Sequence, residues 1–318
     1  MTQLIPQTYK PTKKIYYHVI FLRKLSLLII KIIFPFKKMI FRNIFLQKFQ
    51  SFIEININNI KLKFKDGNER LFIFLNTQYI IEKDLINWIN SFSKQDIFLD
   101  IGSSIGLYSI YSAKKGNLTI ACEGHPANLS DFLYNMHLNN VEKNIITLPI
   151  FLADSNKTSE FFLRDITSSS AKSTLDHNNS PFKNDLKEAM IIKTLNFSLD
   201  RFFDEKIIPV PSKIKIDVDG FEFFILRGIN KYLKYVDEIM IEMFEYDVDV
   251  WKCYYDNKNL ENIDTLGVYP DYHKKNDNSK NPYYEEIINY LEEFSFKEKT
   301  RYGNNIIFQN YSKKNIKS

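Results

Sequence analysis

The sequence is poor in cysteine, glycine and long apolar runs, and each shortage excludes a class of protein. Two cysteines, Cys122 and Cys253, cannot form a disulfide framework or a cysteine-based zinc site. Their scarcity favours a reducing compartment, so we expect a cytoplasmic protein. The apolar part of the N-terminal region has its longest uncharged stretches at residues 15–22 and 25–30. Both fall short of the roughly 20 apolar residues that a membrane-spanning helix needs.

Acidic residues are absent from the first fifty positions, which contain ten lysines and arginines. The rest of the chain carries 33 basic against 38 acidic side chains. A basic N-terminal arm, residues 1–50, therefore precedes a mildly acidic body. Binding of nucleic acid requires a basic face on the fold itself, so we expect no nucleic-acid partner.

The arm has the pattern of an amphipathic helix that is broken or kinked near Pro35. Two interpretations remain open. Residues 17–45 could contact the anionic surface of a membrane, which would place the protein at the inner face. Alternatively, the helix packs on the body and its lysines are solvated. At about 100° per residue, six basic residues fall within an arc of about 140°: Arg23, Lys24, Lys31, Lys37, Lys38 and Arg42.

Hydrophobic periodicity predicts an α/β fold. Residues 52–76 alternate around Asp66-Gly67, which indicates a hairpin, and a helix follows, so residues 51–95 form a lead-in. From residue 96, strands alternate with helices, which predicts a doubly wound, mostly parallel sheet in a domain covering residues 96–318. A C-terminal helix and an antiparallel hairpin through Tyr302-Gly303 close it. The expected strands are 97–102, 118–123, 145–152, 213–220 and 238–242, the expected helices 105–115, 127–140, 221–234 and 283–293, and the expected variable loops 155–195 and 246–282.

Glycine is scarce, with nine in 318 residues where roughly 7% is usual, yet six of the nine lie between positions 100 and 230. Glycine is most useful where the backbone must turn or approach something closely, so the site is expected there. The first strand of the domain ends in the turn Asp100–Gly106, and the second ends in Glu123. A glycine turn with an acid at the next strand end is typical of nucleoside cofactors, whose ribose hydroxyls the acid binds. Ser104 stands where the nicotinamide fingerprint needs its second glycine.

A second group of charges, Lys215, Asp217, Asp219 and Glu222, surrounds Gly220 at the end of the fourth strand. Alternate residues of a strand point to the same face, so Lys215, Asp217 and Asp219 share one side if the strand continues that far. One acid could serve as a general base, with Asp217, Asp219 and Glu222 as the catalytic candidates. A Mg²⁺ site shared with Glu242 or Glu245 is another interpretation. A structural alternative pairs Lys215 with one acid and places Glu222 in the first turn of a helix.

Taken together, the motifs resemble those of the FkbM-type S-adenosylmethionine-dependent methyltransferases over about residues 96–245. Ser103-Ser104, Gly124-His125 and Asp219 depart from the usual family pattern. The resemblance implies a class I, Rossmann-like fold. It also implies that the turn holding Asp100, Gly102, Ser104 and Gly106 contacts the methionine end of the cofactor, that Glu123 holds the ribose, and that Asp154 contacts the adenine amine. The motifs are DIGSSIG, CEGHPANLSDFLYNMHLNN, LADSNK, FSLDRFF, KIKIDVDGFEFFILRG and IMIEMFE.

The expected reaction is methyl transfer from S-adenosylmethionine to a hydroxyl oxygen of a sugar, a glycan or a related acceptor. Two alternatives stay open: a nicotinamide-dependent oxidoreductase of sugar nucleotides, and a non-catalytic, membrane-recruited scaffold with the same fold. Acceptor specificity is expected in residues 155–195 and 246–282. His125 is expected to be a surface-loop histidine. The sequence leaves the acceptor, the metal dependence and the oligomeric state open.

Overall fold

The computed structural model describes residues 52–66, 83–168, 173–175, 187, 189–243, 283–302 and 304–312, with seven further residues between 21 and 32. Most of the basic arm and the predicted loop 246–282 lie outside these ranges, as do Gly67, Glu245 and Gly303. Within the described residues, no helix combines the length and the apolar character needed to cross a bilayer.

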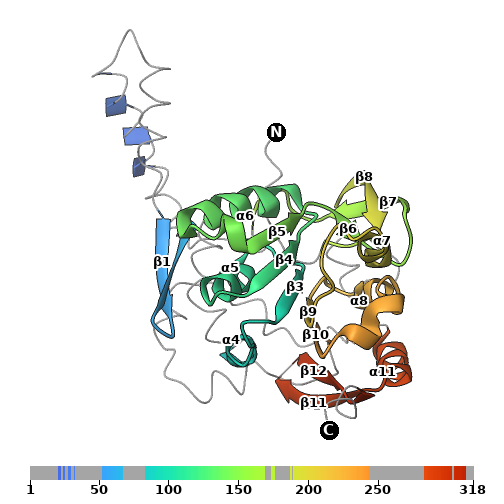
Figure 1. Cartoon of the computed structure of the whole chain (residues 1–318). Coiled ribbons are helices and arrows are strands. Elements are labelled where there is room, and N and C mark those ends of the chain that lie inside the picture. The colour runs from blue at the N-terminus through green and yellow to red at the C-terminus, as the bar shows by residue number, and fades with distance from the viewer. Residues whose placement is uncertain are drawn as a thin grey trace, which may run out of the picture.

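A seven-stranded sheet forms the centre of the molecule (Figure 1), with the strand order β11-β12-β10-β9-β3-β4-β5. Five of its strands are parallel, and β12 and β11 add the predicted antiparallel hairpin. The chain leaves β3 toward β4 and β5 and later returns to the other side of β3 with β9. The predicted doubly wound sheet is therefore confirmed. Its strands are β3 (Ile97–Ile101), β4 (Leu118–Cys122), β5 (Ile145–Leu148), β9 (Lys213–Ile216), β10 (Glu238–Glu242), β11 (Phe296–Tyr302) and β12 (Asn305–Asn310).

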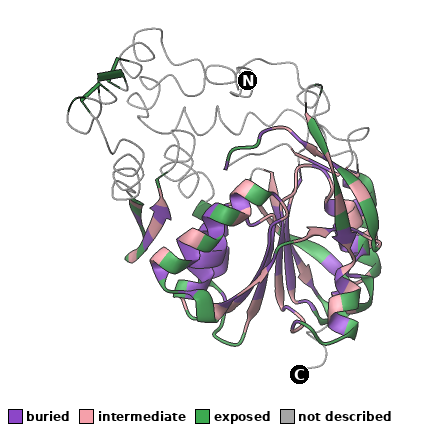
Figure 2. Cartoon of the chain, turned by 90° about the horizontal axis from the view of Figure 1, so that it is seen from above, coloured by how far each residue is buried: buried purple, intermediate pink, exposed green. Residues whose placement is uncertain are grey.

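Helices cover both faces of this sheet, with buried strands between them (Figure 2). Successive residues of a strand point to opposite faces, so Phe98 packs in one apolar cluster and Leu99 in the other. The first cluster joins the sheet to α4 (Lys83–Asn90), α5 (Leu107–Lys114) and α6 (Pro126–Asn139). The second joins it to α7 (Leu199–Asp204), α8 (Glu222–Arg227), the 3₁₀ helix Asn230–Tyr235 and α11 (Tyr284–Glu293).

The expected third strand, 145–152, is wrong in its extent. β5 ends at Leu148, and after Pro149 the chain enters β6 (Phe151–Leu152), which belongs to a separate three-stranded sheet. Proline has no N–H to donate to a strand ladder, so the main sheet loses this strand at that point. The small sheet has the order β6-β8-β7.

The expectation of a variable loop over 155–195 is also wrong in part. β7 (Lys157–Leu163) and β8 (Met190–Phe197) lie inside or across it and pair antiparallel over seven residues. Both strands have exposed or half-buried residues on either side, so their sequences lack the apolar alternation that signals a strand with one buried face.

A hairpin forms in the predicted region, but it lies wholly before Asp66-Gly67, and the second arm expected after that turn, residues 68–76, lies outside the described residues. β1 (Phe52–Ile57) pairs with β2 (Ile60–Lys65), and the two-residue turn is Asn58-Asn59. Both asparagines have positive φ angles, 49° and 66°. Two-residue hairpin turns of the type I′ class need this conformation, which asparagine tolerates better than most residues. Asp66 follows the end of β2.

Candidate functional site

The candidate site lies at the carboxyl ends of β3 and β9, where the strand order changes direction. Ligands of doubly wound sheets bind at such a switch point. The two strand ends are held together closely at Gly102, whose φ is +77°. A Cβ on Gly102 would lie 1.9 Å from the carbonyl oxygen of Asp217. Glycine is therefore required where the end of the first predicted strand meets the end of the fourth.

The turn from Gly102 to Gly106 leads directly into α5. Ser104 has a φ of 51° and Gly106 one of +89°. A Cβ on Gly106 would lie 2.1 Å from the ring of Phe132 on α6, so packing alone already demands this glycine. Ser103 Oγ is buried and has no hydrogen-bond partner within the described part of the chain. A buried polar group without a partner costs free energy, so this hydroxyl is suited to accept or donate a bond to a ligand.

Glu123, directly after β4, is buried and reaches the same turn. Its Oε2 accepts a hydrogen bond from the Ser104 N–H at 2.7 Å, and its Oε1 accepts one from the His125 N–H at 2.7 Å. Burial raises the pKa of Glu123 to about 7, and these two backbone bonds oppose that rise. Each carboxylate oxygen can accept a further bond, so the group can still receive two hydroxyl donors.

The sequence suggested that His125 is a surface-loop histidine, and this expectation is wrong. It is only 4% exposed and forms the N-cap of α6, immediately before Pro126. Its Nδ1 accepts from the N–H groups of Ala127 and Asn128, and its Nε2 lies 2.8 Å from the carbonyl oxygen of Asp165. This pattern requires the neutral tautomer with hydrogen on Nε2. The inserted histidine thus fixes the chain that leaves Glu123.

A buried lysine joins the two strand ends electrostatically. Lys215 on β9 is 2% exposed, and its Nζ lies 2.9 Å from Asp217 Oδ2 and 3.5 Å from Asp100 Oδ1. Asp100 also accepts a 2.5 Å bond from Ser109 Oγ. Burial raises the pKa of Asp100 despite the nearby ammonium. Burial also acts on Asp217, but Lys215 and the side chain of Glu242 outweigh it and lower the pKa of Asp217.

The predicted catalytic acids are therefore not equivalent. β9 ends at Ile216, so the strand does not continue through Asp217 and Asp219 as the argument from alternate residues required. Asp217 pairs with Lys215, whereas Asp219 takes a left-handed φ of 59° in the following turn. Glu222 is fully buried, and its Oε1 accepts bonds from the N–H groups of Gly220 at 3.0 Å and Val218 at 3.3 Å. This geometry favours the structural alternative for Glu222, which braces the turn, and burial raises its pKa to about 7.

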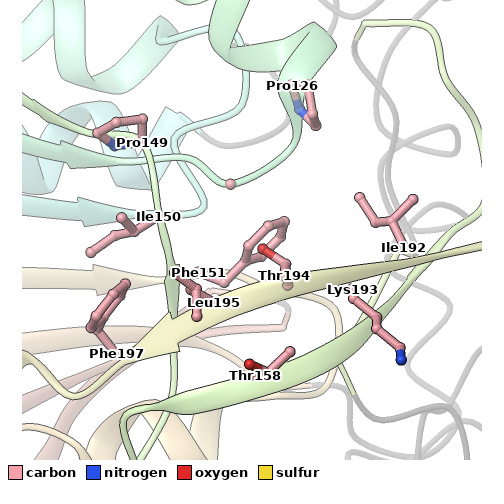
Figure 3. Close-up of a pocket in the computed structure, with 11 residues that line it drawn as sticks. Pro126, Pro149, Ile150, Phe151, Thr158, Ile192, Lys193, Thr194, Leu195 and Phe197 are labelled. Carbon is pink, nitrogen blue, oxygen red and sulfur yellow. The ribbon is translucent and has the colours of Figure 1, made fainter.

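A cavity of about 480 Å³ opens beside Gly124, between the large sheet and the small one (Figure 3). Pro126 and Pro149 border it on the large-sheet side, and β8 forms the opposite side. Side chains from the small sheet thus build one wall of the pocket next to Glu123, which the prediction of a loop over 155–195 missed. The described lining residues are Gly124, Pro126, Pro149, Ile150, Phe151, Thr158, Ile192, Lys193, Thr194, Leu195 and Phe197.

Asp154 lies elsewhere. It is not among the described residues that line this cavity, and its Oδ2 faces Arg227 of α8 at 3.4 Å. The family resemblance assigned Asp154 to the adenine amine, and in the structure it follows β6 of the small sheet.

Among the described residues, the carboxylates near Gly220 do not form a metal cluster. Within the described residues, no three or more His, Cys, Asp or Glu side chains gather where a metal ion could be held. Asp217 instead pairs with the ammonium of Lys215, at 2.9 Å. The Mg²⁺ interpretation therefore finds no support; of its suggested further ligands, Glu242 ends β10 and Glu245 lies outside the described residues.

Comparison with known proteins agrees with the motifs. The model of the methyltransferase FkbM domain matches residues 100–298. A hexuronic acid methyltransferase, AglP of Haloferax volcanii, is 25% identical over 163 residues, which cover 51% of this chain and 62% of that protein. The chain thus matches somewhat under two thirds of that relative's length.

Solved structures in the comparison include an FkbM methyltransferase from Methylobacillus flagellatus, with 15% identity, 69% and 44% of the two chains covered and a TM-score of 0.36. They also include a precorrin-6y C5,15-methyltransferase from Geobacter metallireducens, with 10% identity, 77% and 92% covered and a TM-score of 0.36. Because the matched family model covers more than half of the residues, the chain belongs to the FkbM family of methyltransferases.

Proposed function

We propose that this protein transfers a methyl group from S-adenosylmethionine to a hydroxyl oxygen of a sugar or glycan. The observation that carries the proposal is the hydrogen-bonded contact between Glu123 and the glycine turn. There, a buried carboxylate is fixed by the Ser104 and His125 N–H groups and retains capacity for two hydroxyl donors. A ribose offers two neighbouring hydroxyls. The family match and the sugar-modifying relative support the same reaction class.

In this proposal, the cavity beside Gly124 takes the adenine ring. A flat base needs apolar walls, which Ile150, Phe151 and Leu195 provide, and the cavity adjoins the residue that follows Glu123. The other end of the cofactor would meet the turn of Gly102, Ser104 and Gly106, where Ser103 Oγ offers a polar contact. S-adenosylmethionine supplies an already activated methyl group on a sulfonium. The chain mainly has to align the acceptor with it.

Asp217 is our candidate for the group that receives the acceptor proton. About a third of its side chain is exposed, and Lys215 keeps it ionised by lowering its pKa. An ionised carboxylate with access to solvent can accept a proton, whereas buried Glu222 is occupied by two backbone N–H groups. Asp219 remains a second candidate, because it lies in the same turn. Mg²⁺ is not part of the proposal.

Calorimetric titration with S-adenosylhomocysteine tests cofactor binding. We expect micromolar affinity for the unaltered protein and at least a tenfold loss in Glu123→Ala, because the ribose loses its acceptor. Glu142→Ala, which removes an exposed glutamate paired with His137, is the matched control and should bind normally. Equal affinity in both variants would contradict the role of Glu123. No binding by the unaltered protein would remove the proposed function.

The pH dependence of the same titration is a sharper test. The ribose hydroxyls donate to the ionised carboxylate, and the pKa of Glu123 is raised to about 7 by burial. Binding should therefore tighten by about tenfold from pH 6 to pH 8 as the group ionises. Glu123→Gln should bind weakly with a flat profile. Affinity that falls with rising pH would show that the protonated acid is the binding form.

Transfer of a radiolabelled methyl group to a panel of neutral and uronic-acid glycans tests the acceptor class, with and without added Mg²⁺. We expect incorporation without the metal, and a large loss of kcat in Asp217→Asn at nearly unchanged affinity for S-adenosylhomocysteine. Asp219→Asn is compared in parallel. If both variants retain full activity, neither aspartate is the base, and if no glycan accepts the label, the sugar acceptor is wrong. A non-catalytic scaffold would bind the cofactor and label nothing.

A further inference from the structure

The described part of the N-terminal arm presents an exposed apolar surface that none of the other described residues covers. Residues 21, 22, 24, 25, 28, 29 and 32 are helical, and all seven are exposed. They stand apart from the sheet domain in both views (Figures 1 and 2). Six are large apolar side chains, with exposed fractions from 39% to 70%: Phe21, Leu22, Leu25, Leu28, Ile29 and Ile32.

These six side chains share one face. At about 100° per residue they fall within an arc of about 120°, and Lys24 lies about 100° from the centre of that arc. On the same helical wheel, the sequence positions of Arg23 and Lys31 fall on the side opposite the apolar arc. An apolar stripe with a basic opposite side is the pattern of helices that lie in a membrane interface.

Charge decides which occupant fits this face. The first fifty residues carry ten basic and no acidic side chains, whereas the remaining residues are mildly acidic overall. An anionic lipid surface complements both the apolar stripe and the surrounding positive charge. A second copy of the same helix would cover the stripe but would bring like charges together. The stripe is also too short for a span, so contact would be superficial.

We propose that these six exposed apolar side chains form a docking surface for anionic membranes, which holds the methyltransferase domain at the bilayer. The proposal concerns residues outside the cofactor site. It stands whether or not the acceptor is a glycan. If the acceptor is attached to a lipid, docking would bring it and the enzyme to the same surface.

Co-sedimentation of the full chain with vesicles tests this inference. The vesicles contain phosphatidylcholine either alone or with about a third of phosphatidylglycerol. We expect binding to the anionic vesicles, weakening with added salt, and little binding to the neutral ones. Leu25→Glu combined with Ile32→Glu should lower the bound fraction at least tenfold. The matched control combines Leu133→Glu and Ile207→Glu, which charge exposed apolar residues of the body and should bind normally.

Two results would overturn the inference. One is equal binding by both double variants, and the other is no binding to anionic vesicles. Sedimentation equilibrium without lipid addresses the competing occupant: a dimer that Leu25→Glu with Ile32→Glu dissociates would assign the face to a second copy. Titration of both variants with S-adenosylhomocysteine keeps this test separate from the proposed function, because cofactor binding should be unchanged in each.

Discussion

Two buried glutamates, Glu123 and Glu222, hold the loops of the candidate site by accepting backbone hydrogen bonds. In both, burial raises the pKa to about 7, although the backbone donors oppose the rise. Lys215 acts differently, since it places a buried positive charge between Asp100 and Asp217. The spacing of these residues predicted that they lie at one edge of the sheet. It could not predict which acid Lys215 neutralises, because that depends on side-chain contacts across two strands.

Glu222 should make the stability of the protein depend on pH. Its folded pKa of about 7 lies above the ordinary glutamate value of 4.5, so folding favours the protonated acid. This stabilisation is present at low pH and is lost as the pH rises between about 4.5 and 7. From pH 5 to pH 8, the free energy of unfolding should fall by about 2–3 kcal/mol more in the unaltered protein than in Glu222→Gln.

Urea unfolding at both pH values measures this difference. Glu160→Gln, at an exposed position on β7, is the control and should retain the full pH dependence of the unaltered protein. If Glu222→Gln keeps it too, the raised pKa of Glu222 is wrong.

Gly106 should tolerate no side chain. Gly106→Ala meets both a left-handed φ of +89° and the ring of Phe132, whereas Gly116→Ala meets a φ of +96° with open space around it. Each substitution should cost about 1 kcal/mol for the backbone conformation. Gly106→Ala should lose a further 1–3 kcal/mol, roughly, through overpacking. Thermal unfolding measures the cost of each substitution. The overpacking cost of Gly106→Ala should be smaller when it is measured in a Phe132→Ala background, where the ring is absent. Equal costs for both glycines would contradict the packing argument.

At the scale of elements, the N-terminal hairpin is joined to α6 by side chains that imitate a strand partner. Asn139 accepts from the Lys63 N–H at 2.9 Å and donates to the Lys63 carbonyl oxygen at 2.6 Å, and Asn135 accepts from the Lys65 N–H at 2.7 Å. Lys65 also forms a salt bridge with Asp131 of the same helix. Alternation predicted a hairpin in this region but misplaced its turn. The docking partner of the hairpin could not be predicted, because asparagines in a helix do not reveal which edge they pair with.

Asn139→Ala should release the edge of the hairpin. It leaves the N–H and carbonyl of Lys63 without their partner, which costs roughly 1–3 kcal/mol where the groups are shielded from water. Hydrogen exchange should accelerate at Lys63 while the β3 and β4 amides change little. Asn156→Ala, which removes an exposed bond to the Ser198 N–H, is the control. Unchanged exchange at Lys63 would show that water replaces the side chain without loss.

At the scale of the whole molecule, one buried carboxylate ties together three distant segments at the edge of the sheet opposite the site. Glu238 on β10 accepts from Trp88 Nε1 of α4 at 2.8 Å and pairs with Lys213 of β9 at 3.1 Å and with Lys299 of β11. The lead-in, the central sheet and the C-terminal hairpin meet there. Burial raises its pKa, but Lys299, Lys213 and Trp88 outweigh that effect and lower it.

Glu238→Gln should destabilise the entire domain. It removes the negative partner of two lysines, and breaking a partly buried ion cluster typically costs about 3 kcal/mol or more. Glu298→Gln, which breaks an exposed pair with Arg301, should cost less than about 1 kcal/mol. Chemical unfolding followed by tryptophan fluorescence and circular dichroism measures both. A cost for Glu238→Gln as small as that for Glu298→Gln would mean that the cluster contributes little to stability.

The sequence by itself determined the order of strands and helices in the main sheet, its parallel core, the closing hairpin and the family. Apolar runs of strand length and glycine turns are local signals, and the FkbM motifs combine several of them. Only the tertiary structure decided that Pro149 diverts the chain into a second sheet, that His125 is a buried cap, and that Lys215 neutralises Asp217. Each of these depends on which distant group lies opposite a residue. Spacing along the chain carries no information about that.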